Sequence, residues 1–178
     1  MKYVLFSFIA ITLCASCKKD PVTPIFTKPY PYWGEASATI NGKLWTAQPS
    51  ATVNYIHGHG WDIEIDSFYS GILRQALGIY KVPFTPGTYP VINTFPQEDD
   101  SMVGGDLGYW TADQADGRYT ILESDSSSFV TMQSYDSITK ELRGTFDLTF
   151  IVFHRPYPSS PDTLRVRNGV FHTKVRDL

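Results

Sequence analysis

The strongest structural signal in the sequence is a run of alternating apolar and polar residues over 141–153. Its apolar members are Leu142, Gly144, Phe146, Leu148, Phe150 and Val152, and charged or hydroxyl residues stand between them as far as Ile151. Successive side chains of a β-strand point to opposite faces, so this pattern predicts a long strand with one buried and one solvated face. Such a strand needs a sheet protein around it.

Shorter segments repeat the same period. Apolar residues alternate with polar ones over 61–66 and again over 73–79, which predicts two further strands. Asn41-Gly42 separates two alternating segments, 36–40 and 43–47, and both residues tolerate the positive φ of a type I′ hairpin turn. Near the C-terminus the parity changes at Asn168-Gly169, where we expect a bulge or a tight turn.

The sequence shows no comparably clear helical pattern. No eleven-residue window carries a convincing apolar stripe of helical spacing, although 106–116 has room for one helical turn. Aromatic residues make up 15% of the chain, which suits a sheet protein better than a helical bundle. We therefore predict an all-β fold with little or no helix, an antiparallel β-sandwich over residues 34–178, with a closed β-barrel as the alternative.

The N-terminal segment does not belong to this fold. Lys2 precedes an apolar run of about eleven residues and then small residues, the order of a secretory signal over 1–16. The apolar run is shorter than the ~20 residues that a transmembrane helix needs. Residues 17–33 contain four prolines and are expected to form an extended tether.

The junction of these segments, Leu13-Cys14-Ala15-Ser16-Cys17, resembles a bacterial lipobox. The resemblance implies cleavage before Cys17 and attachment of lipid to its thiol, which leaves no thiol for a disulfide. The following Lys18-Lys19-Asp20 resembles the signals that send Bacteroidetes lipoproteins to the outer face of the outer membrane. The alternative is a solvated charge cluster on a tether that faces the periplasm.

A second resemblance covers most of 36–175 in order. Residues 38–47, Tyr135-Asp136 before 144–146, and the closing 168–171 resemble a β-rich family of Bacteroidetes lipoproteins of uncharacterised activity. The resemblance implies the same compartment and fold, and it brings no catalytic residues.

Two groups of residues suggest metal binding. His57 and His59 lie two apart, so that on an extended chain both imidazoles would face one way, but no third ligand has a diagnostic spacing. Asp62, Glu64 and Asp66 have the spacing of the first calcium-loop ligands, but the later positions do not match that loop. We expect solvated histidines in a loop and a solvated strand face, respectively.

The interval 94–117 shows no clean alternation and is expected to be a long connection, of the kind that is often functional. Its acids, between residues 98 and 116, would suffice to gather one calcium ion. Its Tyr109-Trp110 pair is our candidate ligand-binding site, because an exposed aromatic face binds the apolar side of a sugar ring. Burial is the favoured alternative for this pair, and Trp45 and Trp61 follow the parity of core residues.

Composition and the absence of known motifs argue against several classes of function. A formal net charge of −3 argues against a nucleic-acid binder. The chain has no Gly-x-Ser-x-Gly nucleophile motif, and we expect no cofactor and no catalysis. The expected function is that of a lipid-anchored module that binds a glycan or another extracellular ligand. The alternatives are assembly with an envelope protein through a strand edge and, third, a hydrolase.

Overall fold

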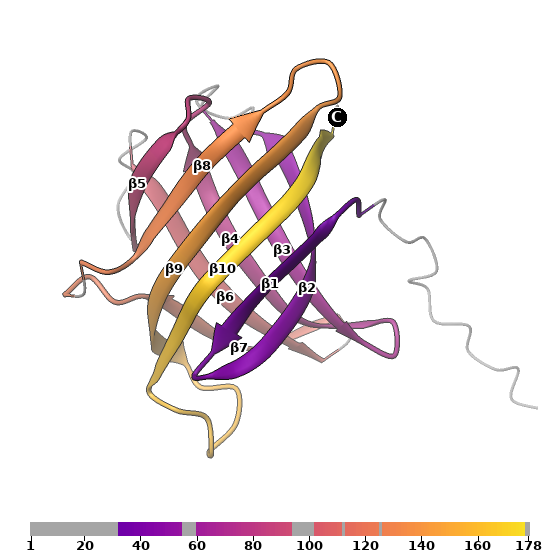
Figure 1. The fold of residues 1–178 in the computed structure, drawn as a ribbon. Coiled ribbons are helices and arrows are strands. Elements are labelled where there is room, and N and C mark those ends of the chain that lie inside the picture. Colours follow the sequence, from indigo (N-terminus) through magenta and orange to yellow (C-terminus); the bar gives the residue numbers. More distant parts are fainter. Residues whose placement is uncertain (1–31, 55–59, 94–101, 112, 125, 177–178) are drawn as a thin grey trace, which may run out of the picture. The chain divides into compact units, whose positions relative to one another are not determined.

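The computed structural model describes residues 32–54, 60–93, 102–111, 113–124 and 126–176, and residues 31–178 belong to one compact unit. The predicted all-β class is confirmed, since these described residues form ten strands and no helix (Figure 1). The strands are β1 (Glu35–Ile40), β2 (Lys43–Val53), β3 (Trp61–Tyr69), β4 (Ile72–Val82), β5 (Gly87–Ile92), β6 (Val103–Thr111), β7 (Gln114–Ile121), β8 (Phe129–Tyr135), β9 (Glu141–His154) and β10 (Thr163–Arg176). The signal segment, Cys17 and the His57–His59 pair lie outside the described residues. No helix in the described part of the chain is long and apolar enough to span a membrane.

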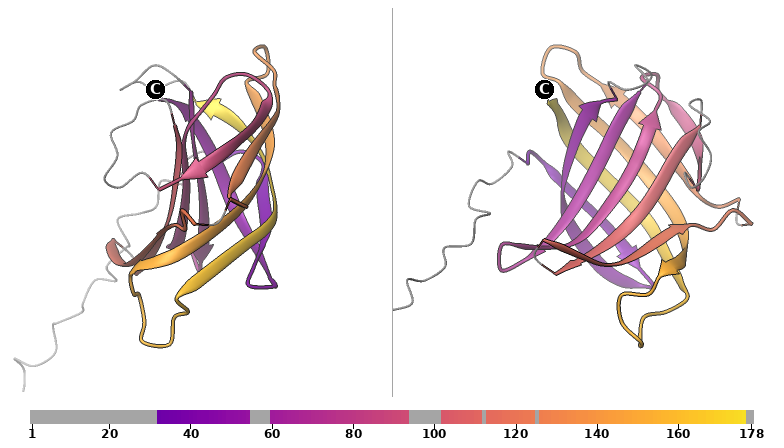
Figure 2. Two further views of the ribbon diagram at one scale, coloured as in Figure 1. Left: turned by 90° about the vertical axis from the view of Figure 1, so that its left-hand side faces the viewer. Right: turned by 180° about the vertical axis from the view of Figure 1, so that it is seen from behind.

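The strands form two facing layers, as expected for a sandwich (Figures 1 and 2). One layer contains β2, β3, β4 and β6, and the other contains β1, β10, β9 and β8. Hydrogen bonds join the layers at both edges, because β10 pairs with β2 and β7 pairs with both β6 and β9. The pairing is antiparallel except at two short ladders, β2–β10 and β5–β6, which are parallel.

The turns of the β1–β2, β3–β4, β6–β7 and β9–β10 hairpins lie at one end of the layers, which we call the hairpin end (Figure 1). The first of them contains Asn41-Gly42, with φ of 49° and 78°. These positive values are those of the predicted type I′ turn. The register shift between Val166 and Gly169, with Asn168 at φ 53°, confirms the predicted bulge in β10.

The predicted strand over 141–153 is β9, and it supplies the centre of the core. Leu142, Phe146, Leu148 and Phe150 are fully buried between the layers. Phe171 of β10 packs against Phe146, with ring centroids 6.3 Å apart. The period-two pattern therefore gave the burial correctly along most of this strand.

The expectation for 94–117 is wrong. Most of this interval forms β6 and the start of β7, and the helical turn considered for 106–116 is a β-hairpin. The alternation of β6 is not visible in the sequence, because Gly104, Gly105 and Gly108 interrupt its apolar pattern. Only 94–101 and residue 112 of this interval lie outside the described residues.

Candidate functional site

The outward faces of β3, β4, β6 and β7 form a continuous surface in which small and charged side chains replace the apolar ones of the core. Ala76 and Gly78 of β4 pair with Gly108 and Asp106 of β6. Three of these four positions have little or no side chain, so neighbouring rings can lie directly on the strand backbone. They form the floor of the candidate site.

Two aromatic side chains lie on this floor. A Cβ atom added at Gly108 would stand 2.9 Å from Nε1 of Trp110, and one added at Gly78 would stand 2.0 Å from the hydroxyl of Tyr80. Each ring therefore covers the glycine two residues before it on its own strand. Because β4 and β6 are antiparallel, the two rings extend toward each other along the floor. We call Tyr80, Trp110 and the floor of Ala76, Gly78, Asp106 and Gly108 the outer platform.

A hydrogen-bonded network fixes the middle of the outer platform. The Tyr80 hydroxyl donates to Oδ1 of Asp106 over 2.8 Å, and the Arg118 guanidinium of β7 donates to Oδ2 of the same carboxylate. Asp106 is 8% exposed, whereas the Arg118 side chain is 36% exposed. Burial, together with the charge of Asp106, raises the pKa of Tyr80, so this hydroxyl remains a donor at neutral pH. The network presents a cation and an oriented phenol beside the Trp110 indole.

On the β3 side, the platform is bordered by Asp66, which corrects the expectation of a solvated strand face. Asp66 is only 4% exposed because the Tyr32 ring covers it, and the Tyr32 hydroxyl donates to its carboxylate over 2.6 Å. Burial raises the pKa of Asp66 to about 6. Tyr32 also packs edge-on against Phe68, with ring centroids 5.4 Å apart. Glu64, two residues before Asp66, remains exposed on the same face.

The structure separates the two members of the predicted Tyr109-Trp110 site. Tyr109 points between the layers, where it forms a hydrogen bond with Gln75 and its ring lies 5.7 Å from that of Tyr119. Trp110 points outward onto the outer platform and is half-buried. Its Nε1 is buried over Gly108 and has no hydrogen-bond partner among the described residues.

The other tryptophans lie where their parity predicted. Trp45 and Trp61 are core residues, 8% and 5% exposed. Trp45 donates to Gln75 over 2.8 Å, and Trp61 packs edge-on against Phe84. Trp33, 37% exposed, lies edge-on against His172 on the outer side of β10, away from the outer platform.

Within the described residues, no three His, Cys, Asp or Glu side chains come together as a metal site. Of the acids considered for calcium, Asp106 belongs to the outer platform, and Asp116 accepts a hydrogen bond from Thr111 at the β6–β7 turn. The three acids at 98–100 lie outside the described residues. The described acids of this segment are therefore distributed along a hairpin.

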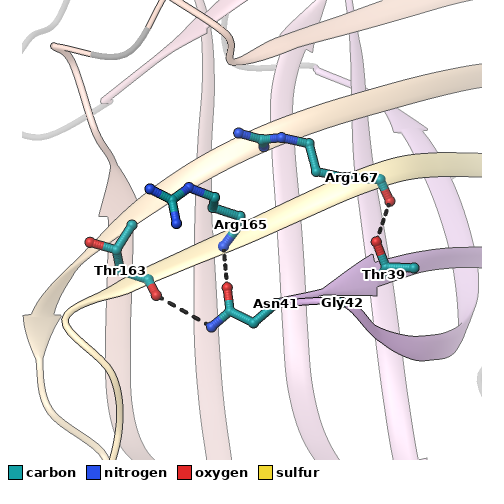
Figure 3. A pocket seen from close by; sticks show the side chains of 6 residues that line it. All are labelled: Thr39, Asn41, Gly42, Thr163, Arg165 and Arg167. Atoms are coloured by element: carbon teal, nitrogen blue, oxygen red, sulfur yellow. Dashed lines mark hydrogen bonds between the residues drawn. The ribbon is translucent and has the colours of Figure 1, made fainter.

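An open hollow of about 490 Å³ lies on the outer face beside the β1–β2 turn (Figure 3). Its lining is Thr39, Asn41, Gly42, Thr163, Arg165 and Arg167. Asn41 fixes its base, because Oδ1 accepts a hydrogen bond from the Arg165 backbone N–H over 2.8 Å and Nδ2 donates to the Thr163 carbonyl. This hollow is basic and separate from the outer platform.

Sequence reasoning missed Tyr80 and Arg118 and considered Asp106 only as a calcium ligand; the three residues come from three strands. The register that joins them is a long-range property that local periodicity does not contain. One local signal pointed to the outer platform, since glycine inside a strand often marks the close approach of another group. Gly78 and Gly108 both carry that signal.

Comparison with protein-family models, with curated proteins and with solved structures found no match.

Proposed function

We propose that this protein is a non-catalytic, lipid-anchored binding protein of the outer membrane and that its outer platform binds a glycan. The observation that carries the proposal is the Trp110 indole, which lies over Gly108 on an outward sheet face. An aromatic face held in this way packs against the apolar face of a sugar ring. Arg118, 36% exposed, adds a positive charge beside that ring.

Preorganisation also supports binding. Tyr80 and Arg118 hold the Asp106 carboxylate from both oxygens, and the Gly108 backbone supports Trp110. A ligand that docks on this surface therefore has few side chains to order, which lowers the entropic cost of association. The same engagement of Asp106 gives no support to the hydrolase alternative, because a general base needs a carboxylate that can reach the substrate's proton.

Assembly through a strand edge has weaker support. Each of the ten described strands pairs with at least two others. Addition of a partner's strand requires a row of unpaired backbone groups, which is typical of a strand with only one neighbour. We therefore favour a side-chain surface over a backbone edge as the place of recognition.

The membrane attachment is a proposal from the sequence. It rests on the lipobox-like residues before Cys17 and on the proline-rich tether after it. Several acyl chains on one cysteine give durable anchoring, whereas one chain is marginal. Mass spectrometry of the membrane fraction should find an acylated N-terminal Cys17, and an unmodified thiol there would contradict the anchor.

Binding is tested with two soluble polysaccharides, glucomannan as a neutral probe and polygalacturonate as an acidic one, by titration calorimetry. We expect one of them to bind and Trp110→Ala to weaken that binding by about fivefold or more, the worth of one aromatic contact. Trp33→Ala is the matched control, since it removes a partly exposed indole elsewhere on the molecule.

Equal losses in the two variants would contradict the assignment of the site to the outer platform. Failure of both polysaccharides to bind would contradict the glycan proposal itself. Far-UV circular dichroism of each variant shows whether the fold is retained.

A further inference from the structure

The exposed apolar side chains of the described residues are concentrated at the hairpin end. Seven of the eleven exposed large hydrophobic residues lie there, namely Leu44, Phe68, Tyr69, Ile72, Ile151, Phe153 and Tyr157. They come from three different hairpins. Leu44 and Phe153 are 78% and 72% exposed, so water surrounds them almost completely. Apolar side chains gathered at one end in this way indicate a contact surface.

The basic hollow lies within this end (Figure 3). Its lining residues include Arg165 and Arg167 and no acidic residue. Both terminal nitrogens of Arg167 are engaged, because Nη1 donates to the Leu148 and Val166 carbonyls and Nη2 donates to the Ser127 and Thr149 hydroxyls. The Arg165 side chain has no hydrogen bond or ion pair with any described residue and points away from the strand into solvent. The hollow therefore offers the unengaged Arg165 guanidinium to an anion, and Arg167 adds a fixed positive charge beside it.

Strand register places apolar residues on both sides of the hollow. Leu44 of β2 pairs with Thr39, which lines the hollow, and Ile151 of β9 pairs with Thr163 on its other side. Cross-strand partners point to the same face of a sheet. Phe153, two residues beyond Ile151, extends the apolar side along the same face of β9. Apolar and basic groups thus alternate across one outward surface.

We propose that the hairpin end is a membrane-contact surface that docks on a bilayer containing anionic, phosphate-bearing lipids. The apolar side chains enter the interfacial region of the bilayer, and a lipid phosphate binds to Arg165, next to the positive charge of Arg167. This pairing of apolar groups with cations is the chemistry by which peripheral proteins bind anionic membranes. The surface is distinct from the outer platform and uses none of its residues.

The length of chain before the described residues permits this docking. Residues 18–31 would span roughly 40 Å in an extended, proline-rich conformation. β1 has six residues and is about 20 Å long. A tether that starts at Cys17 is therefore long enough for the hairpin end to reach the bilayer. Only this step uses the proposed acylation of Cys17; the apolar and basic residues stand independently of it.

Site-specific probes test the docking. The full chain with Cys14→Ser and Cys17→Ser carries an environment-sensitive fluorophore at Leu44→Cys, at Phe153→Cys or, as the control, at Ile138→Cys. Ile138 is 91% exposed and lies in the β8–β9 turn at the opposite end. On vesicles of phosphatidylcholine and phosphatidylglycerol in equal parts, we expect a blue shift and higher emission from positions 44 and 153 and none from 138. Equal responses at all three positions, or no response at 44 and 153, would overturn the proposal.

The phosphate contact is tested with Arg165→Gln in the chain labelled at position 44. One basic residue near an anionic surface is worth about a fivefold change in binding, so the vesicle concentration for half-maximal response should rise by about that factor. Arg143→Gln is the control, because Arg143 lies on the outer face of β9 toward the opposite end. If Arg165→Gln leaves the vesicle concentration for half-maximal response unchanged, the proposed role of the hollow is wrong.

Free inorganic phosphate, compared with sodium chloride at equal ionic strength, distinguishes the two sources of the anion. Specific loss of the vesicle response in phosphate would show that the hollow prefers a free anion, which would overturn the lipid assignment. A loss that is equal in both salts is expected, because screening alone then weakens the attraction to anionic lipid. The Trp110→Ala binding result does not bear on either arm, so failures of the two proposals are distinguishable.

Discussion

At the scale of single residues, Asp66 shows how position overrides sequence pattern. Its place among alternating acids and apolar residues predicted a solvated carboxylate, and the strand alternation is correct. The prediction failed for Asp66 because Tyr32, 34 residues earlier, covers its side chain and donates to it. Burial holds its pKa at about 6, above the ordinary 3.8. The hydrogen bond from Tyr32 opposes this rise but does not cancel it.

This raised pKa makes stability depend on pH. Between the unfolded value of 3.8 and the folded value of about 6, the folded state binds more protons than the unfolded state. The contribution of Asp66 to stability is therefore fully present below the unfolded value and is lost as the pH rises through the folded one. We expect Asp66→Asn to remove this loss, which amounts to about 2 kcal/mol after allowance for solvent screening.

Urea unfolding at several pH values measures the difference in the free energy of unfolding between Asp66→Asn and the wild type. It should grow as the pH rises across the interval, and a constant difference would contradict the assignment. Tyr32→Phe keeps the Asp66 carboxyl group and removes the hydrogen-bond donor that lowers its pKa. In that variant the loss of stability with rising pH should therefore continue to higher pH than in the wild type.

At the scale of strands and turns, local pattern predicted the elements that alternate cleanly. β9, the Asn41-Gly42 hairpin and the bulge at Asn168 all follow from side-chain period and turn chemistry. β6 escaped prediction because glycine contributes no apolar side chain, even at the inward position of Gly105. The outer platform could not be predicted for a second reason, since its residues meet only through the register of β4 with β6 and of β6 with β7.

Gly144 of β9 is a glycine that packing requires. A Cβ atom there would lie 2.5 Å from the Thr131 carbonyl oxygen of β8 and 2.5 Å from the Phe171 ring. Neither neighbour is free to move, because one is ladder backbone and the other is buried in the core. We expect Gly144→Ala to lower the free energy of unfolding by about 2 kcal/mol.

Gly42→Ala is the matched control for that substitution. Nothing lies within 4 Å of a Cβ atom at Gly42, so the cost there comes only from its φ of +78° and should be about 1 kcal/mol. Urea denaturation measures both variants. Equal costs would show that the close contacts of Gly144 are relaxed by small backbone shifts.

At the scale of the whole folded unit, the hydrogen-bonded edges make the two layers one cooperative structure. The first strand, β1, pairs with the last, β10, as well as with β2. Contacts between strands so far apart in sequence form late and slow the folding of a sheet protein. The core also runs without interruption from Trp45 near the hairpin end to Trp61 at the opposite end.

We therefore expect both ends of the unit to unfold together. Two variants, each retaining only Trp45 or only Trp61 with the other tryptophans replaced by phenylalanine, report on the two ends by fluorescence. Their urea midpoints should coincide with each other and with the midpoint from far-UV circular dichroism. Midpoints that differ between the two ends would show that the layers separate before the strands melt.

The position of β1 also has a mechanical consequence. It lies between β2 and β10 and pairs antiparallel with both, with one register shift between Ser37 and Thr39 on the β10 side. A force transmitted through the N-terminal segment along the axis of β1 would load both ladders in shear, so their bonds must fail together rather than one after another. With the proposed anchor at the N-terminus and the proposed glycan on the outer platform, drag on the glycan would thus load these two ladders in shear.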